Sequence, residues 1–203
     1  MVPSIKAVIW DMGGVLLRTD DPQPREKLAQ RLGLSSDALA HRVFESPAAA
    51  QATLGKITDV EMWRRVAADL GVSEREAPDL ALEFFAGDKL DEPLVDFIRS
   101  LRPCYRTGLL SNAWPNARQM LTEHYACLDA FDVAVISAEV GLAKPDQRIF
   151  QMVVDRLDVQ PAEAVFIDDF SVNIDGARAA GLNAIHFHNR DQALQDLGAF
   201  LEP

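Results

Sequence analysis

Short apolar runs alternate with amphipathic segments along most of this 203-residue sequence. Several runs lack a clear alternation of apolar and polar residues, which is typical of parallel strands buried on both faces of a sheet. The predicted strands are Ile5–Trp10, Tyr105–Leu110, Val133–Ser137, Ala164–Asp168 and Asn183–Phe187. Helical periodicity predicts helices at Glu92–Arg102, Pro115–His124, Pro145–Leu157, Val172–Ala180 and Gln192–Leu201. This order predicts an α/β fold, with a Rossmann-like parallel sheet that helices cover on both sides.

The stretch from Leu17 to Asp88 interrupts this alternation and contains no convincing strand. Its helical segments are short and are broken by Gly, Pro or Ser. They are Arg25–Leu32, Asp37–Phe44, Asp59–Leu70 and Glu74–Phe85. An all-helical block inserted after the first strand predicts a cap on the sheet. The expected boundaries are 1–16 and 89–203 for the core and 17–88 for the cap, with linkers at Leu17–Asp20 and Gly87–Asp91.

Composition favours a folded, soluble protein. Hydrophobic residues make up 48% of the chain and charged residues 25%, which is enough for a packed core. Cys104 and Cys127 fit no zinc signature and are expected to be reduced thiols of a cytoplasmic protein. We find no signal peptide and no apolar run near the ~20 residues that a membrane span requires. Whether the chain is a monomer or a homodimer stays open.

The formal net charge of −11 limits the partners that this surface attracts. An acidic surface repels nucleic acids and anionic membranes at long range, so neither is an expected partner. The same field repels a phosphorylated substrate. A phosphate site on this chain therefore needs a metal ion, helix N-termini or fixed cations to overcome that repulsion locally.

Polar residues stand where the first two strands of the core end, and parallel sheets bind ligands at this edge. Asp11 follows the first strand and precedes Gly13 and Gly14, whose backbone can turn sharply and approach a ligand closely. Ser111 and Asn112 follow the second core strand and can hydrogen-bond a phosphate oxygen. Taken singly, each group also fits an ordinary turn.

Two further polar groups stand later in the chain. Lys144 precedes Pro145, which suits the first position of a helix, where anions are favoured. Asp168 and Asp169 end a buried strand, where two adjacent carboxylates repel each other unless a divalent cation such as Mg²⁺ lies between them. A solvated lysine and a pair of capping carboxylates are the ordinary alternatives.

The four groups, in this order around a helical insert, resemble the haloacid-dehalogenase-like hydrolases with a helical cap. Asp11 matches the nucleophile of the first motif, and Ser111 matches the second motif. Lys144, in its Gly-Leu-x-Lys-Pro context, matches the third. Asp168 and Asp169, followed by Asn173, match the acidic fourth motif. The resemblance covers nearly the whole chain and implies the α/β core with its cap.

The resemblance also implies a mechanism. Asp11 would attack phosphorus and form an aspartyl phosphate that water then hydrolyses. Mg²⁺ would lie between the Asp11 carboxylate, the Gly13 carbonyl and Asp169, with Asp168 behind them or bound through water. Lys144 would neutralise charge on the nucleophile and the phosphoryl group. The expected phosphate ligands are Ser111, Asn112, Lys144 and the backbone of Gly13 and Gly14.

The sequence departs from the family pattern at Gly13. Most phosphatases of the family carry a second Asp there, which protonates the leaving group and later activates water. The favoured function is a Mg²⁺-dependent phosphohydrolase of a small phosphorylated metabolite, for which a sugar phosphate is one candidate. A metal-independent 2-haloacid dehalogenase and a non-catalytic binding module on the same fold are the alternatives.

The cap is expected to set substrate specificity, because the core site handles only the phosphoryl group. Five side chains are candidates to reach a substrate, although each also fits ordinary surface or packing. They are Arg18, His41, Arg42 and Lys56 from the cap and Trp114 from the core. Trp63, Phe84 and Phe85 are expected to form the core of the cap itself.

Overall fold

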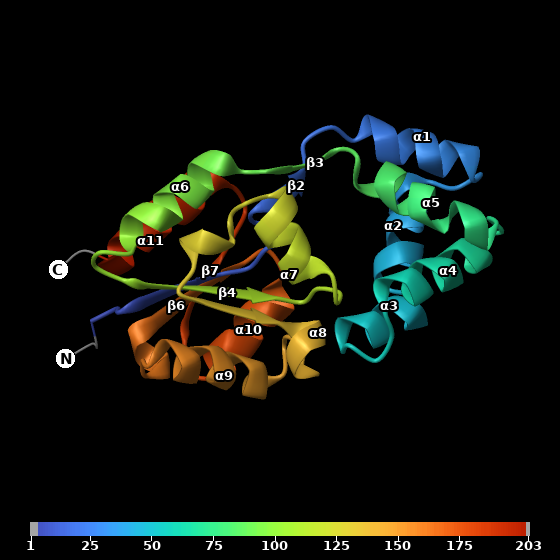
Figure 1. Ribbon diagram of the computed structural model, residues 1–203. Helices are drawn as coiled ribbons and strands as arrows, with labels where there is room; N and C mark the ends of the chain where they lie inside the picture. The colour runs from blue at the N-terminus through green and yellow to red at the C-terminus, as the bar shows by residue number, and fades with distance from the viewer. Residues whose placement is uncertain (1–3, 202–203) are drawn as a thin grey trace.

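The computed structural model describes residues 4–201 and contains a five-stranded parallel sheet in the order β5-β4-β1-β6-β7 (Figure 1). The strands are β1 Ala7–Trp10, β4 Arg106–Ser111, β5 Val133–Ile136, β6 Ala164–Asp168 and β7 Asn183–His186. The predicted α/β class and the five predicted core strands are therefore confirmed, with ends that differ by at most two residues.

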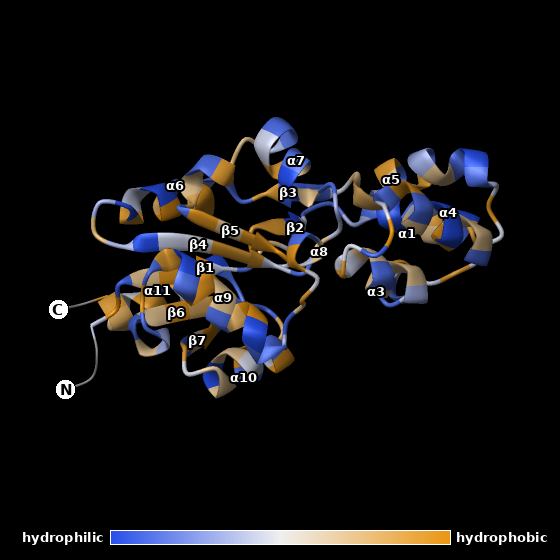
Figure 2. Cartoon of the chain, turned by 60° about the horizontal axis from the view of Figure 1, so that its bottom comes forward, coloured by the Kyte–Doolittle hydropathy of each residue, from blue (hydrophilic) through white to orange (hydrophobic). Residues whose placement is uncertain are grey.

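Helices cover both faces of this sheet because its strands are apolar on both sides. On β1, Val8 and Trp10 face a cluster with α6 (Glu92–Leu101) and α11 (Arg190–Leu201). Ala7 and Ile9 face the opposite cluster, with α9 (Gln147–Leu157) and α10 (Ser171–Ala179). In Figure 2 the strands are mostly hydrophobic in colour, whereas the surrounding helices carry both colours. Such a core fixes the strand ends rigidly, which positions whatever follows them.

The helical insertion lies to one side of the sheet and has a hydrophobic core of its own (Figure 1). Its helices are α1 Gln23–Arg31, α2 Ser36–Phe44, α3 Pro47–Thr53, α4 Asp59–Asp69 and α5 Ala77–Phe85. Ser35, Ser46 and Thr58 cap three of these helices by accepting a hydrogen bond from a backbone N–H of the first turn. Leu39, Met62 and the predicted Phe84 are fully buried between the helices.

A short ribbon joins the insertion to the sheet. Strands β2 (Leu17–Thr19) and β3 (Asp88–Leu90) pair antiparallel, so the chain leaves and re-enters the core side by side. The expectation that Leu17–Asp88 holds no strand is therefore wrong at its two ends. Each strand is three residues long and forms only because its partner, about 70 residues away in sequence, lies beside it.

Three other differences from the predicted elements are local. Helix α3 and the short helix α8 (Ser137–Val140) were not predicted. The predicted helix Pro115–His124 is the short α7 (Ala117–Gln119) followed by a π-helical turn. Pro145 precedes the N-cap Asp146 of α9 and so does not stand at the first helical position. Among residues 4–201, every helix is too short or too polar to cross a membrane.

Candidate active site

The parallel register brings the first and fourth motifs together. Trp10 pairs with Ile167, so Asp11 and Asp168 leave adjacent strands at the same edge of the sheet. The Asp11 N–H donates to the Ile167 carbonyl (2.9 Å), which carries the β1–β6 pairing to the nucleophile position. Because this backbone hydrogen bond continues the ladder beyond the end of β1, the position of Asp11 is fixed by the sheet.

Lys144 joins these two carboxylates. Its Nζ lies 2.7 Å from Asp11 Oδ1 and 2.6 Å from Asp168 Oδ2. The side chains of Lys144, Asp11 and Asp168 are only 1%, 8% and 0% exposed. These two ion pairs are needed because an isolated buried charge is strongly unfavourable. The predicted third-motif lysine therefore contacts the predicted nucleophile directly.

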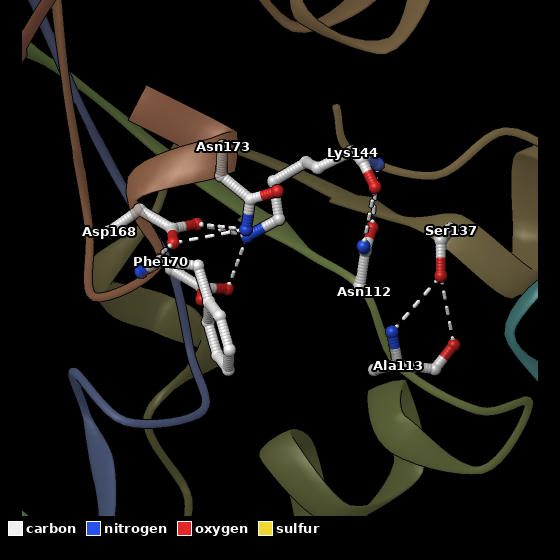
Figure 3. A network of polar contacts seen from close by, with 8 residues as sticks. Asn112, Ala113, Ser137, Lys144, Asp168, Phe170 and Asn173 are labelled. Carbon is white, nitrogen blue, oxygen red and sulfur yellow. Dashed lines mark hydrogen bonds and ion pairs between the residues drawn. The ribbon is translucent and has the colours of Figure 1, made fainter. Parts of the chain in front are cut away.

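The two carboxylates of the acidic pair have different surroundings (Figure 3). Asp168 accepts hydrogen bonds from Lys144 Nζ, from the Asn173 side-chain amide (3.0 and 3.1 Å) and from the Phe170 N–H (2.8 Å). Asp169 Oδ1 is buried and has no hydrogen-bond partner among the described residues. Asp168 is thus saturated by donors, whereas Asp169 retains an oxygen that needs a positive partner.

A divalent cation fits this arrangement. One carboxylate oxygen from each of Asp11, Asp168 and Asp169 lies within 4.8 Å of the others. Hard oxygen ligands are those that Mg²⁺ prefers. The Gly13 carbonyl accepts no hydrogen bond from the described residues and is free to be a further ligand.

Burial perturbs the ionisation of these carboxyl groups. Burial raises the pKa of Asp11 from 3.8 to about 7; the Lys144 charge opposes this shift and the Asp168 charge adds to it. Burial also raises the pKa of Asp169, and the neighbouring Asp168 charge raises it further. A bound cation would stabilise both ionised forms, as a nucleophilic carboxylate requires.

The two glycines after Asp11 differ in what they allow. Gly14 has a φ of +78°, and a Cβ there would lie 2.0 Å from Asp169 Oδ2, so only glycine is accommodated. A Cβ on Gly13 would meet no atom within 4 Å, and its φ lies outside the left-handed region. Gly14 is therefore required by the packing of the site, whereas the space beside Gly13 is open.

The second motif is fixed by side-chain to backbone hydrogen bonds. Asn112 donates from its amide to the Lys144 carbonyl (2.9 Å) and accepts from the Lys144 N–H (2.8 Å). Ser137 Oγ accepts from the Ala113 N–H (3.0 Å) and donates to the Ala113 carbonyl (3.1 Å), as Figure 3 shows. Ser111, the last residue of β4, is 1% exposed. Asn112 thus positions the lysine, a role that the sequence did not indicate.

Comparison with known proteins agrees with this geometry. The family model of haloacid dehalogenase-like hydrolases matches residues 5–181. The chain belongs to this family. The predicted resemblance is therefore confirmed, and the chain is a hydrolase by family.

The chain matches some relatives along almost their whole length and others along only part of it. The D-ribitol-5-phosphate phosphatase of Bacteroides thetaiotaomicron is 28% identical over 97% of this chain and 98% of its own length. The bifunctional epoxide hydrolase 2 of Sus scrofa is 27% identical over 96% of the chain, which spans only 38% of that larger protein. A family enzyme of B. thetaiotaomicron, solved with magnesium and inorganic phosphate, has a TM-score of 0.76 at 22% identity, covering 94% of this chain and 99% of its own.

Most residues of the insertion that were expected to reach a substrate form contacts elsewhere. Arg18 pairs with Asp91 (2.5 Å) at the ribbon. His41 and Arg42 pair with Glu45 and Asp69 within the insertion. Lys56 is exposed and follows Gly55, which lies against the Ala138 carbonyl of the core. Trp114 packs among the aromatic residues of the insertion, 5.8 Å from Trp63 and 6.1 Å from Phe85 between ring centroids.

Proposed function

We propose that this hydrolase is a Mg²⁺-dependent phosphatase that removes phosphate from a small phosphorylated metabolite through an aspartyl phosphate. The observation that carries the proposal is the buried group of three carboxylates, of which Asp169 has an unpartnered oxygen, joined to Lys144. Relatives that are named phosphatases support it. A sugar phosphate is one candidate substrate, because one such relative is named for D-ribitol-5-phosphate.

Each side chain has a distinct task in this proposal. Asp11 attacks phosphorus while the ester oxygen leaves, and water then cleaves the acyl phosphate and returns Asp11 to its carboxylate. Lys144 holds Asp11 in place and offsets negative charge on the phosphoryl group. When bound, Mg²⁺ would be held by Asp11, the Gly13 carbonyl and Asp169, and would neutralise charge on the phosphate. Ser111 remains the predicted phosphate ligand at the end of β4.

A 2-haloacid dehalogenase is the second candidate, and Gly13 is the observation that favours it. In that reaction Asp11 attacks carbon, and neither a metal nor an acid at position 13 is needed. The unpartnered Asp169 oxygen weighs against it, because a metal-free site leaves that buried atom unsatisfied.

We also propose that residues 17–88 act as a cap over the core formed by 1–16 and 89–203. The insertion joins the core through the β2–β3 ribbon and has its own hydrophobic cluster. A cap that excludes water and contacts the leaving group would set specificity. A cytoplasmic location, with no nucleic acid or membrane partner, stays our prediction.

The proposal is tested by hydrolysis of an aryl phosphate with and without Mg²⁺. We expect turnover that a chelator abolishes, that Asp11→Asn loses entirely, and that Asp169→Asn retains only at a Mg²⁺ concentration raised about 10- to 100-fold. Asp175→Asn, an exposed aspartate on α10, is the matched control. Wild-type turnover in Asp11→Asn contradicts the nucleophile assignment, and halide release from a 2-haloacid in the presence of chelator supports the dehalogenase.

A further inference from the structure

Gly13 occupies the position where the family pattern places a proton-donating Asp, and the space that a side chain would fill there is open. Gly13 is exposed, two residues after the nucleophile, and its ordinary backbone φ imposes no need for glycine. Steric constraints therefore do not require glycine at position 13, whereas they do at position 14. The consequence of glycine at position 13 is chemical, because a residue without a side chain has no group there that can donate a proton.

Asp169, whose oxygen has no partner among the described residues, is assigned to the metal, and the other titratable groups of the site are already engaged. Lys144 binds two carboxylates, and Asp168 accepts from Lys144, Asn173 and the Phe170 N–H. Within residues 4–201, no fourth His, Cys, Asp or Glu joins the group formed by Asp11, Asp168 and Asp169. His186 Nε2 lies 2.9 Å from the Asp169 carbonyl oxygen and is engaged there.

We propose, resting on the phosphatase function above, that the substrate is a phosphate whose leaving group departs without being protonated. When Asp11 attacks, an Asp11 O–P bond forms and the P–O bond to the leaving group breaks, its electron pair staying on the leaving oxygen. With no acid in place, that oxygen carries the charge until solvent protonates it. The class is thus acyl, enol, aryl or anomeric sugar phosphates, whose parent groups are more acidic than a primary alcohol. The substrate of this chain therefore differs in class from the primary phosphate for which the D-ribitol-5-phosphate phosphatase is named.

The test is the dependence of kcat/KM on the leaving group, because kcat/KM reports the steps up to its departure. The probes are aryl phosphates of increasing phenol pKa, together with ribose 1-phosphate and ribose 5-phosphate as a matched pair of isomers. We expect kcat/KM to fall steeply along the aryl series. We expect the anomeric isomer to exceed the primary phosphate by about 10²-fold or more, since general acid catalysis contributes about 10²- to 10⁴-fold.

Gly13→Asp supplies the acid that the site lacks, and the open space accommodates it. This variant should flatten the aryl series and raise kcat/KM for ribose 5-phosphate by at least about tenfold. Gly13→Asn, which is of equal size but cannot donate a proton in this way, should leave the slope steep. Circular dichroism of both variants checks folding, and the wild-type series is decisive even when neither variant folds.

The outcomes separate this inference from the function on which it rests. A wild-type enzyme that hydrolyses ribose 5-phosphate as well as its isomer, with a flat aryl series, overturns the substrate class but keeps the phosphatase. Absence of turnover on every phosphate, aryl phosphates included, overturns the phosphatase itself. A steep slope that Gly13→Asp flattens and Gly13→Asn does not supports both.

Discussion

Asp11 has its carboxylate in a place that largely excludes water. The backbone of β1 and β6 leaves it no alternative position, because its N–H is bonded to the Ile167 carbonyl. Lys144 compensates part of the charge, but burial and the neighbouring Asp168 still raise the pKa of Asp11 to about 7. Ionised Asp11 thus costs stability, and a bound cation would remove that cost.

This cost predicts a pH-dependent gain of stability in Asp11→Asn. The folded-state pKa is about 7 and the ordinary value is 3.8, so the folded protein holds the proton more tightly. The destabilisation by ionised Asp11 is therefore absent below about pH 4, grows as pH rises, and is complete above about pH 7. Without metal at pH 8, Asp11→Asn should have a free energy of unfolding that is higher than that of wild type by up to about 4 kcal/mol. It should therefore unfold at a higher temperature.

Thermal unfolding at pH 5 and pH 8, with chelator and with Mg²⁺, measures this effect. The gain should shrink at pH 5, and Mg²⁺ should stabilise the wild-type protein more than the variant. Asp175→Asn, which changes an exposed aspartate, should behave as wild type at both pH values. A metal-free Asp11→Asn that is less stable than wild type at pH 8 would contradict the prediction.

The β2–β3 ribbon is anchored by one buried aspartate. Asp91 follows β3, caps α6 by accepting from the Leu94 N–H (3.1 Å), and pairs with Arg18 (2.5 Å) and Arg190 (3.0 Å). Burial works to raise the pKa of Asp91, but these three donors together hold it below its ordinary value. One side chain therefore ties the ribbon to α6 and to the start of α11.

Replacing this aspartate should destabilise the core and the ribbon together. Asp91→Ala removes a helix cap and leaves two arginines without their buried partner, for a loss of about 2–4 kcal/mol in the free energy of unfolding. Chemical denaturation measures it. Asp20→Asn is the control, since Asp20 forms an exposed ion pair with Lys89 on the same ribbon and should give no measurable change. Equal stability of the two variants would show that Asp91 anchors nothing.

At the scale of the whole molecule, an aromatic cluster joins the insertion to the sheet domain. Trp114, from the loop after β4, packs among Phe44, Trp63 and Phe85 of the insertion. Two further contacts are polar or involve the backbone. The Asn116 N–H donates to Asp59 (3.0 Å), and a Cβ on Gly55 would lie 2.1 Å from the Ala138 carbonyl. The aromatic contact is thus an apolar attachment of the insertion to the sheet domain.

Trp114→Ala should therefore loosen the cap and leave the sheet intact. Loss of three aromatic contacts should cost about 2–4 kcal/mol, and hydrogen exchange should quicken in α2, α4 and α5 before it does in β1 and β6. The KM for a phosphorylated metabolite should rise more than kcat falls, since closure is affected and the chemistry is not. Trp114→Phe, which keeps a ring, should lie near wild type. Uniform exchange across both parts would contradict a separate cap.

Much of the fold follows from local sequence signals. The apolar runs for β1, β4, β5, β6 and β7 are long enough and bounded clearly enough to predict strands, and polar residues at their ends predict where a site lies. The three-residue strands β2 and β3 carry no such signal, because pairing between distant segments forms them. Helix α3, a run of mostly small residues, lacks the apolar periodicity that marks its neighbours.

The sequence by itself determined the α/β class, the helical insertion and the residues Asp11, Lys144 and Asp168-Asp169, because strand patterns and motif spacing are local properties of the chain. Only the tertiary structure decided which groups each of these residues contacts. In the structure, Asp168 is surrounded by hydrogen-bond donors and Asp169 keeps an oxygen without a partner among the described residues. The Asn112 side chain is hydrogen-bonded to the Lys144 backbone. These distinctions depend on contacts between segments far apart in sequence, which no local pattern records.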